Sequence, residues 1–180
     1  MNQGNNYRIQ GLNPKIGRLY AHDLSSLYHD SVQHCANGIY SQAQCDAWSF
    51  APRSDYYWFK QLSRNKSWLA LTQPQSSSAQ ERVCMGFVSM ATRFQERGYI
   101  EHLYVAPHYQ RQGIAIELLN QLECWAVAQN YRQLTTDASA LSKAAFLRQG
   151  FHIKHKTYQQ KRGQILQGFY MVKSLKGHHI

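Results

Sequence analysis

The apolar residues in the first quarter of the chain follow helical spacing. Between positions 24 and 35 they recur at intervals of three and four residues, which predicts a helix that Asp23 caps and Gly38 ends. A second, shorter helix is expected to begin at Ser41, because Gln44 three residues later completes a capping-box pattern. This part of the chain is therefore predicted to be helical.

From Ser67 onward the pattern changes to that of strands. Three extended stretches are separated by turn-forming residues, and we expect them to be antiparallel neighbours. They cover 68–72, 83–92 and 99–105. The polar run 73–80 between the first two is typical of a loop and is too short to separate two domains.

Beyond Pro107 the helical spacing returns, with the apolar residues of 115–126 on one face. The later elements expected are a strand at 133–137, a helix at 141–148 that Gly150 closes, and a final strand pair at 151–158 and 165–173. The strand–helix–strand order between 99 and 137 favours a parallel crossover. The predicted fold class is α+β, with a mixed, mostly antiparallel central sheet flanked by helices.

The composition is typical of one globular domain over residues 1–180. Of these residues 43% are hydrophobic and 13% aromatic, which is enough for a sizeable core. The start of the chain lacks the features of a signal peptide, and no apolar run approaches the roughly 20 residues that span a bilayer. The four cysteines are scattered, which indicates reduced thiols rather than a disulfide scaffold or a zinc ribbon. We therefore expect a cytoplasmic protein without a membrane partner.

The charge balance narrows the choice of partners. Twenty Lys and Arg against ten Asp and Glu give a net charge of +10, which favours nucleic acid, a membrane surface or a phosphate-rich cofactor. The basic residues are dispersed and no nucleic-acid-binding motif accompanies their densest group, within 154–162, so nucleic acid is the weaker candidate. No metal is expected, since His152 and His155 on one strand would point to opposite faces.

The stretch 99–115 has the layout of an anion site: a strand, a tight basic loop and the start of a helix. The first N–H groups of a helix have no partner within it and carry the positive end of its dipole, so a loop that exposes them can hold phosphate oxygens. Gly113 lets the backbone approach closely, and Arg111 adds charge. The alternative is an ordinary strand-to-helix turn in which Gly113 only relieves crowding.

The same stretch resembles the acetyl-coenzyme A motif of the GCN5-related N-acetyltransferases (GNAT). In that family a strand ending in Leu-Tyr-Val-x-Pro leads into Gln/Arg-x-x-Gly-x-Gly/Ala at the start of a helix, and Leu103–Pro107 and Gln110–Ala115 match this pattern. A second match, 139–151, is similar to the family's Asn-x-x-Ala-x-x-x-Tyr-x-x-x-Gly-Phe helix. Two further segments, 40–48 and 169–171, resemble one bacterial branch of the family.

The resemblance implies the GNAT fold, acetyl-coenzyme A as the acetyl donor, and a strand that splays from its neighbour so that its backbone can pair with the pantetheine arm. The cofactor-binding residues that it implies are Leu103, Tyr104, Val105, Gln110, Arg111, Gln112, Gly113, Ile114, Ala115, Ser139, Ser142 and Phe146. Ser139 stands where the family often has Asn. Phe146 stands where the family often has the tyrosine that serves as general acid. A phenylalanine cannot donate a proton, so the resemblance assigns no residue to that role.

The candidate catalytic residues lie mostly on the strand that should carry the acetyl group. Glu101 and His102 are the candidates for the base that removes the amine proton, and strand alternation would send them to opposite faces, so that at most one faces the acceptor. A water chain is the alternative base. Tyr170 is the first candidate for the acid that protonates the coenzyme A thiolate. The alternative is that Tyr170 only packs against the sheet. Cys84 is expected to be a buried structural thiol.

Two classes of function remain. The leading one is an enzyme that transfers an acetyl group to a primary amine of a small-molecule or peptide acceptor, by direct attack in a ternary complex. The other is a non-catalytic acyl-coenzyme A sensor, which Phe146 favours, or a basic nucleic-acid-binding module. The aromatic run 48–59 either walls the acceptor pocket or packs in the core. The sequence does not identify the acceptor. It does not determine the oligomeric state either, for which a homodimer is one candidate.

Overall fold

The structure, a computed structural model, describes residues 6–34, 38–73, 82–92 and 98–175. Residues 35–37 and 74–81 lie outside these ranges, so most of the predicted loop at 73–80 is not described. The first predicted helix ends at Gln33, with His34 as its C-cap, several residues before Gly38. Among the described residues no helix is both long enough and apolar enough to cross a bilayer.

Within these ranges seven strands form one mixed sheet in the order β1-β2-β3-β4-β5-β7-β6. The strands are β1 (Tyr7–Gly11), β2 (Asn65–Thr72), β3 (Cys84–Ala91), β4 (Tyr99–Val105), β5 (Gln133–Ser139), β6 (His152–Lys161) and β7 (Gln164–Ser174). Every neighbouring pair is antiparallel except β4 and β5, which are parallel. The predicted α+β class and the parallel crossover are therefore confirmed.

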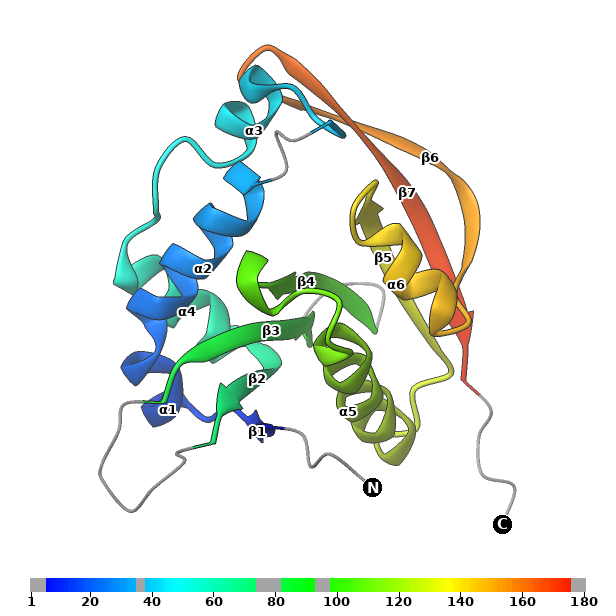
Figure 1. Cartoon of the computed structure of the whole chain (residues 1–180). Coiled ribbons are helices and arrows are strands. Elements are labelled where there is room, and N and C mark those ends of the chain that lie inside the picture. The colour runs from blue at the N-terminus through cyan, green and yellow to red at the C-terminus, as the bar shows by residue number, and fades with distance from the viewer. Residues whose placement is uncertain (1–5, 35–37, 74–81, 93–97, 176–180) are drawn as a thin grey trace.

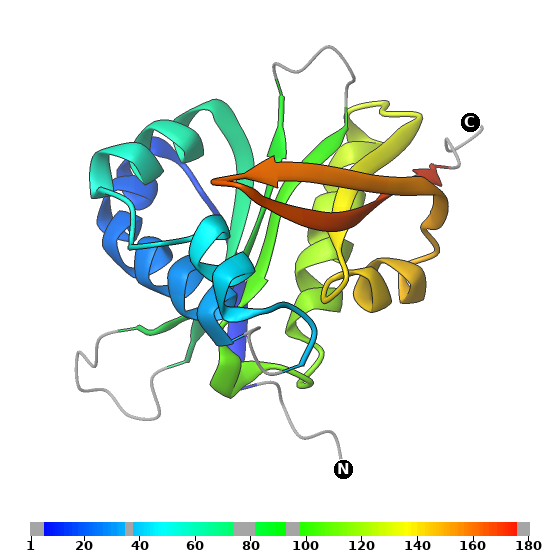
Figure 2. The same cartoon turned by 90° about the horizontal axis from the view of Figure 1, so that it is seen from above.

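Helices cover both faces of the sheet. They are α1 (Pro14–Leu19), α2 (Ala21–Gln33), α3 (Gln42–Trp48), α4 (Asp55–Arg64), α5 (Ile114–Ala128) and α6 (Lys143–Arg148), with a 3-10 turn η2 over Pro107–Tyr109. The first four lie on one face, and α5 lies on the other (Figures 1 and 2).

The sheet separates two apolar cores, and β3 supplies both. Val88 and Met90 pack with Leu118 of α5 on one side, whereas Phe87 packs on Trp58 of α4 on the other, with ring centroids 5.4 Å apart. Because β3 is buried on both faces, its sequence is apolar throughout apart from Ser89, rather than alternating.

Several element boundaries agree with the sequence, and some do not. The capping box at the start of α3 is present, with Ser41 and Gln44 bonding reciprocally. The prediction that Asp23 caps α2 is wrong: the helix begins at Ala21, and Asp23 lies in its first turn. Helix α6 starts two residues later than predicted, with Ser142 at its N-cap position.

Three elements were not predicted: β1, α1 and α4. Helix α1 follows Asn13, whose side chain accepts a hydrogen bond from the Ile16 N–H at 2.9 Å. Helix α4 contains most of the aromatic run, and its N-cap Ser54 accepts a hydrogen bond from the Tyr57 N–H at 3.2 Å. Both starts carry ordinary capping signals.

The feature that positions the functional site is a split in the middle of the sheet. Strands β4 and β5 pair only at their starts, through Tyr99 with Thr135 and Ile100 with Thr136. Beyond Ile100 the two strands separate, and β5 instead pairs along its whole length with β7. The sheet therefore opens between β4 and β5, as the family resemblance implied (Figure 1).

Candidate active site

The split leaves a narrow cavity of about 60 Å³ between the two strands. Leu103 and Tyr104 line it from β4, and Thr136 and Asp137 line it from β5. The Ala106 N–H donates to a β3 carbonyl, that of Met85, at 2.9 Å. Because successive backbone groups alternate in direction along a strand, the N–H groups at 103 and 105 point away from β3 and toward the split.

The loop after β4 is shaped for an anion. Arg111 and Gly113 adopt left-handed φ angles of 61° and 83°, and α5 begins directly after Gly113. Within the described chain, the backbone N–H groups of 111–115 donate to no other backbone carbonyl. A Cβ added at Gly113 would meet no heavy atom within 4 Å. The loop thus presents unpaired N–H groups and the positive end of the α5 dipole to open space.

The two glutamines of the loop hold its shape. Gln110 Nε2 donates to the Val105 carbonyl at 3.1 Å, and Gln112 Nε2 donates to the His108 carbonyl at 3.2 Å. Their side chains therefore brace the loop against the end of β4 and against η2. Of the predicted coenzyme residues in this loop, these two support its structure with their side chains and leave its backbone N–H groups exposed.

The remaining predicted coenzyme residues, further along the chain, lie at the other wall of the narrow cavity. Ser139, Ser142 and Phe146 all line it, and the two serines bond reciprocally, each backbone N–H donating to the other's hydroxyl at 3.0–3.1 Å. Phe146 is 2% exposed and packs on Phe151, with ring centroids 5.1 Å apart. Phe146 therefore fills the place of the family's tyrosine as an apolar wall.

A larger cavity, about 300 Å³ in volume, lies on the side of β4 that faces α2 and α4. Aromatic rings from five parts of the chain form much of its wall; they are Tyr28, Tyr40, Trp48, Tyr57, Tyr99 and Tyr104. From the aromatic run 48–59, Trp48 and Tyr57 line the cavity, and Trp58 is buried in the core. The run is thus divided: Trp58 packs in the core, as one interpretation held, and a role of the other rings at an acceptor stays a prediction.

Hydrogen bonds from α3 and the segment before it hold the far wall of this cavity in place. The Tyr40 hydroxyl donates to the Gln167 carbonyl of β7 at 3.1 Å and accepts from the Ala140 N–H at 3.0 Å. Gln44 Nε2 donates to the Ile165 carbonyl at 2.8 Å. The β6–β7 hairpin is therefore tied to the helical side of the molecule across the cavity.

The prediction that Glu101 and His102 face opposite sides is wrong. Ser89 of β3 pairs with His102 and the next residue, Met90, pairs with Ile100, so Glu101 is skipped as the extra residue of a β-bulge. A bulge interrupts the alternation of side chains. Both residues consequently line the large cavity, with His102 Nδ1 and Glu101 Oε2 3.9 Å apart.

A hydrogen-bond network that sequence reasoning missed holds these two residues. Asn65 Nδ2 donates to Glu101 Oε2 at 2.7 Å and to Ser89 Oγ at 3.1 Å, and Ser89 Oγ lies 3.0 Å from His102 Nδ1. Asn65 stands where α4 ends and β2 begins. Its position in the sequence gives no sign of this contact, since only the sheet brings it to β4.

His102 and Glu101 differ in burial. The His102 side chain is 11% exposed and the Glu101 side chain 33%. Burial lowers the pKa of His102 to about 4, so the imidazole is neutral near neutral pH. The ring packs among Tyr28, Trp58 and Phe87. Glu101 is thus the more accessible of the two predicted bases.

Tyr170 is not brought together with the other predicted catalytic residues. Its ring stacks on His155 of β6, with centroids 5.1 Å apart, and it lines neither the narrow nor the large cavity. Tyr104 is the tyrosine that, among the described residues, lines both. Cys84 is buried and burial raises the pKa of its thiol to about 12, as expected of a structural thiol.

The histidines of β6 depart from the predicted alternation in the same way as β4. His152 pairs with Val172 and His155 with Tyr170, because a second irregularity skips Lys154, so both histidines are on one face. Even so, the described ranges contain no group of three or more His, Cys, Asp or Glu side chains that could hold a metal ion.

The narrow and the large cavity share part of their lining. The shared residues are Trp48, Glu101, His102, Tyr104, Asp137 and Ser139. A loop of exposed backbone N–H groups and a split strand pair on one side thus meet an aromatic cavity with two carboxylates on the other.

The sequence profile of the acetyltransferase (GNAT) family matches residues 30–151. The chain belongs to this family. A relative, the uncharacterised N-acetyltransferase YafP of Escherichia coli (strain K12), is 30% identical over 148 residues, which cover 82% of this chain and 85% of the relative.

Solved structures with the same fold include two acetyltransferases, one of them a putative one. A GCN5-related N-acetyltransferase from Rhodopseudomonas palustris has a TM-score of 0.76 and 25% identity, over 93% of this chain and 95% of its own. The yncA protein of Salmonella typhimurium, solved with acetyl-coenzyme A, has a TM-score of 0.66 and 17% identity over 97% of each chain. At the latter identity the likeness is one of fold.

Proposed function

We propose that this protein transfers an acetyl group from acetyl-coenzyme A to a primary amine, by direct attack while donor and acceptor are bound together. The observation that carries the proposal is the shared wall of the two cavities, at which Glu101 and His102 lie. Membership of the GNAT family supports acetyl transfer. The yncA structure, which has this fold, was solved with acetyl-coenzyme A.

The residues on the donor side fit a coenzyme A molecule. The N–H groups of 111–115 and the start of α5 would hold the pyrophosphate, with the open space over Gly113 leaving room for it. The backbone N–H groups at 103 and 105 would hold the pantetheine arm in the split. Acetyl-coenzyme A supplies an acetyl group that is activated as a thioester.

On the acceptor side we assign Glu101 as the group that accepts the proton of the attacking amine, directly or through a water molecule. Its carboxylate is accessible from the cavity and is fixed by Asn65 at 2.7 Å. His102 is the weaker candidate, because an imidazole with a pKa of about 4 takes up protons poorly near neutral pH. We assign His102 the task of positioning Ser89 and the wall around Glu101.

For the proton that the departing thiolate needs, we assign Tyr104. It lines both cavities, and a phenol at that boundary is within the region where donor and acceptor would meet. Tyr170 remains the candidate suggested by the sequence, but its ring is engaged with His155 outside both cavities. Phe146 has no proton to give.

The test is a thiol-release assay with acetyl-coenzyme A against a panel of primary amines, run beside a thermal melt with the same coenzyme. We expect release that depends on the amine, and a raised melting temperature because the coenzyme binds the folded state. A melting shift with no release for any amine would support the sensor instead. Absence of both would refute the proposed function.

A further inference from the structure

The large cavity is lined by side chains of both charges. Glu101 of β4 and Asp137 of β5 bring carboxylates, and Arg53 from the loop before α4 and Lys161 at the end of β6 bring cations. None of the ion pairs found among the described residues joins a member of one set to a member of the other, within 4 Å. The two signs of charge are therefore held apart.

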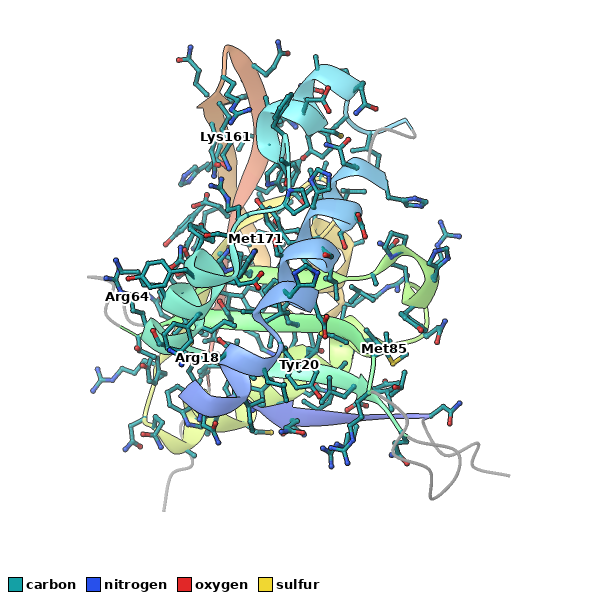
Figure 3. The ribbon with its side chains drawn as sticks, turned by 90° about the vertical axis from the view of Figure 1, so that its left-hand side faces the viewer. Arg18, Tyr20, Arg64, Met85, Lys161 and Met171 are labelled. Carbon is teal, nitrogen blue, oxygen red and sulfur yellow. The ribbon has the colours of Figure 1, made fainter. Side chains whose placement is uncertain are left out.

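Aromatic rings of the cavity wall hold the two cations. Lys161 Nζ lies 6.0 Å from the centroid of the Trp48 ring, and the Arg53 guanidinium lies 4.8 Å from that of Tyr57. Ser25 Oγ also donates to the Arg53 carbonyl at 2.5 Å and fixes the backbone there. Figure 3 shows Lys161 on the orange β6–β7 hairpin beside the cyan helix α3.

The two cations repel each other, and none of the described carboxylates lies within 4 Å of either to offset this. Burial lowers the pKa of the Lys161 ammonium, and the charge of Arg53 lowers it further. An anion of the ligand placed between them would relieve both effects, since charge-assisted hydrogen bonds to lysine and arginine are among the stronger ones. The arrangement is that of a receptor for an anionic group.

The carboxylates are held by neutral donors. Asn65 donates to Glu101 at 2.7 Å, and the Tyr99 hydroxyl donates to Asp137 Oδ2 at 3.2 Å. Burial and the charge of Asp137 raise the pKa of Tyr99, so this phenol stays protonated. Within the described chain neither carboxylate has a lysine or arginine within 4 Å, so both can bind an amine or ammonium group of the ligand.

We propose that the acceptor is a small amphoteric molecule, with its primary amine toward Glu101 and Asp137 and an anionic group, such as a carboxylate, held by Arg53 and Lys161. This inference rests on the proposed function and specifies its substrate. The volume of about 300 Å³ is at the lower end for ligand pockets, which suits an amino-acid-sized molecule. A diamine or polyamine would bring a second cation against Arg53 and Lys161.

Phosphates bound at the loop 110–115 would not explain why Arg53 and Lys161 line the large cavity. None of the residues 110–115 lines the large cavity, so the phosphates expected at that loop do not account for Arg53 and Lys161. The pair belongs instead to the acceptor side, where the β6–β7 hairpin and the α3–α4 connection meet.

The test compares matched acceptors in the thiol-release assay: glycine, β-alanine, γ-aminobutyrate and phenylalanine, each beside its primary amide. Aminoethylphosphonate beside β-alanine separates a phosphonate from a carboxylate preference, and diaminopropane serves as the dicationic control. For the best acceptor we expect kcat/KM to exceed that of its amide by tenfold or more. Equal rates for acid and amide, or a preference for diaminopropane, would overturn the inference.

Variants of Arg53 and Lys161 test whether these two cations cause the preference for the acid over its amide. Lys161→Met and Arg53→Gln should each lower kcat/KM about tenfold on the anionic acceptor and leave the amide nearly unchanged, and Lys161→Arg should restore most of the loss. Lys156→Met, on the exposed part of the same strand, is the matched control and should behave as wild type. An equal loss on acid and amide would indicate a merely structural role and would contradict the proposal.

A binding experiment separates this inference from the proposed function. Calorimetry with the N-acetylated form of the best acceptor, beside its amide, needs no turnover; if the panel yields no acceptor, N-acetylglycine and N-acetylphenylalanine are used. We expect the acid to bind at least tenfold more tightly than the amide, and the difference to vanish in Lys161→Met. If this preference holds without any acetyl transfer, the proposed function fails and the anion site stands. If transfer occurs without the preference, only the anion site fails.

Discussion

Gly113 offers a sharp test of whether the coenzyme loop, residues 110–115 after β4, binds coenzyme A. Its surroundings separate the backbone strain that a substitution causes from the charge that it adds. Its φ of 83° is one that residues with a side chain adopt at a cost of about 1–2 kcal/mol. A Cβ there would nevertheless meet nothing within 4 Å. Gly113→Ala should therefore lower stability through backbone strain alone, by roughly 2–8 °C in melting temperature for a chain of this size.

Gly113→Asp adds a charge where the pyrophosphate should lie. Two unit charges about 4 Å apart at a protein surface repel by about 1–4 kcal/mol, which corresponds to roughly 5-fold to 700-fold weaker binding of coenzyme A. The assay is calorimetric titration with coenzyme A, together with a thermal melt. We expect one site per wild-type chain and at least fivefold weaker binding in the variant.

Gly163 provides the matched control. Its φ is 77°, and a Cβ there would also meet nothing within 4 Å, but it lies at the tip of the β6–β7 hairpin. Gly163→Asp should cost similar stability and leave coenzyme affinity unchanged. If Gly113→Asp binds coenzyme A as tightly as Gly163→Asp does, the loop is only a turn and the reasoning fails.

Three further predictions concern Glu101, Tyr104 and His102, which line both cavities. Glu101→Gln keeps the hydrogen bond from Asn65 but cannot accept a proton, so the rise of kcat/KM with pH should disappear; a profile like that of wild type would assign the base elsewhere. Tyr104→Phe should lower kcat about 10- to 100-fold with coenzyme affinity retained, and Tyr170→Phe should not; the reverse result would return the acid to Tyr170. Because the pKa of His102 is lowered from 6.5 to about 4 on folding, the unfolded chain binds the extra proton, and stability should fall as the pH drops through that window. From pH 7 to pH 5 this group should cost about 2 kcal/mol in urea unfolding, and His102→Gln should lack that component; the same loss in both proteins would show that His102 is not the cause.

The parts of the site that depend on local sequence were predictable. The bounds of β4 agree with the strand predicted at 99–105, and the loop before α5 has the glycine and the exposed N–H groups that its sequence implied. These features follow from residues that are neighbours in the chain. The same holds for the capping box of α3.

The parts that depend on pairing were not predictable. Alternation assigned Glu101 and His102 to opposite faces because it assumes a regular ladder, and the bulge that unites them is a property of the register between β3 and β4. Asp23 has the character of a helix cap, but Tyr20 ends α1 and precedes α2 directly, so the second helix starts earlier. The folded chain alone brings Arg53 and Lys161 to the wall of the same cavity.

The β6–β7 hairpin supplies part of the wall of the large cavity from outside the segment that the family profile matches. The family profile match ends at residue 151, so Lys161 and the β7 residues that line the large cavity lie beyond it, whereas the coenzyme loop and the split strands lie within it. The hairpin reaches the helical side through a few hydrogen bonds, from Tyr40 and Gln44. Under the proposed function, we expect changes at Lys161 and the cavity-lining residues of β7 to alter acceptor choice without touching the donor half, provided that the pairing of β7 with β5 and the core residue Met171 are kept.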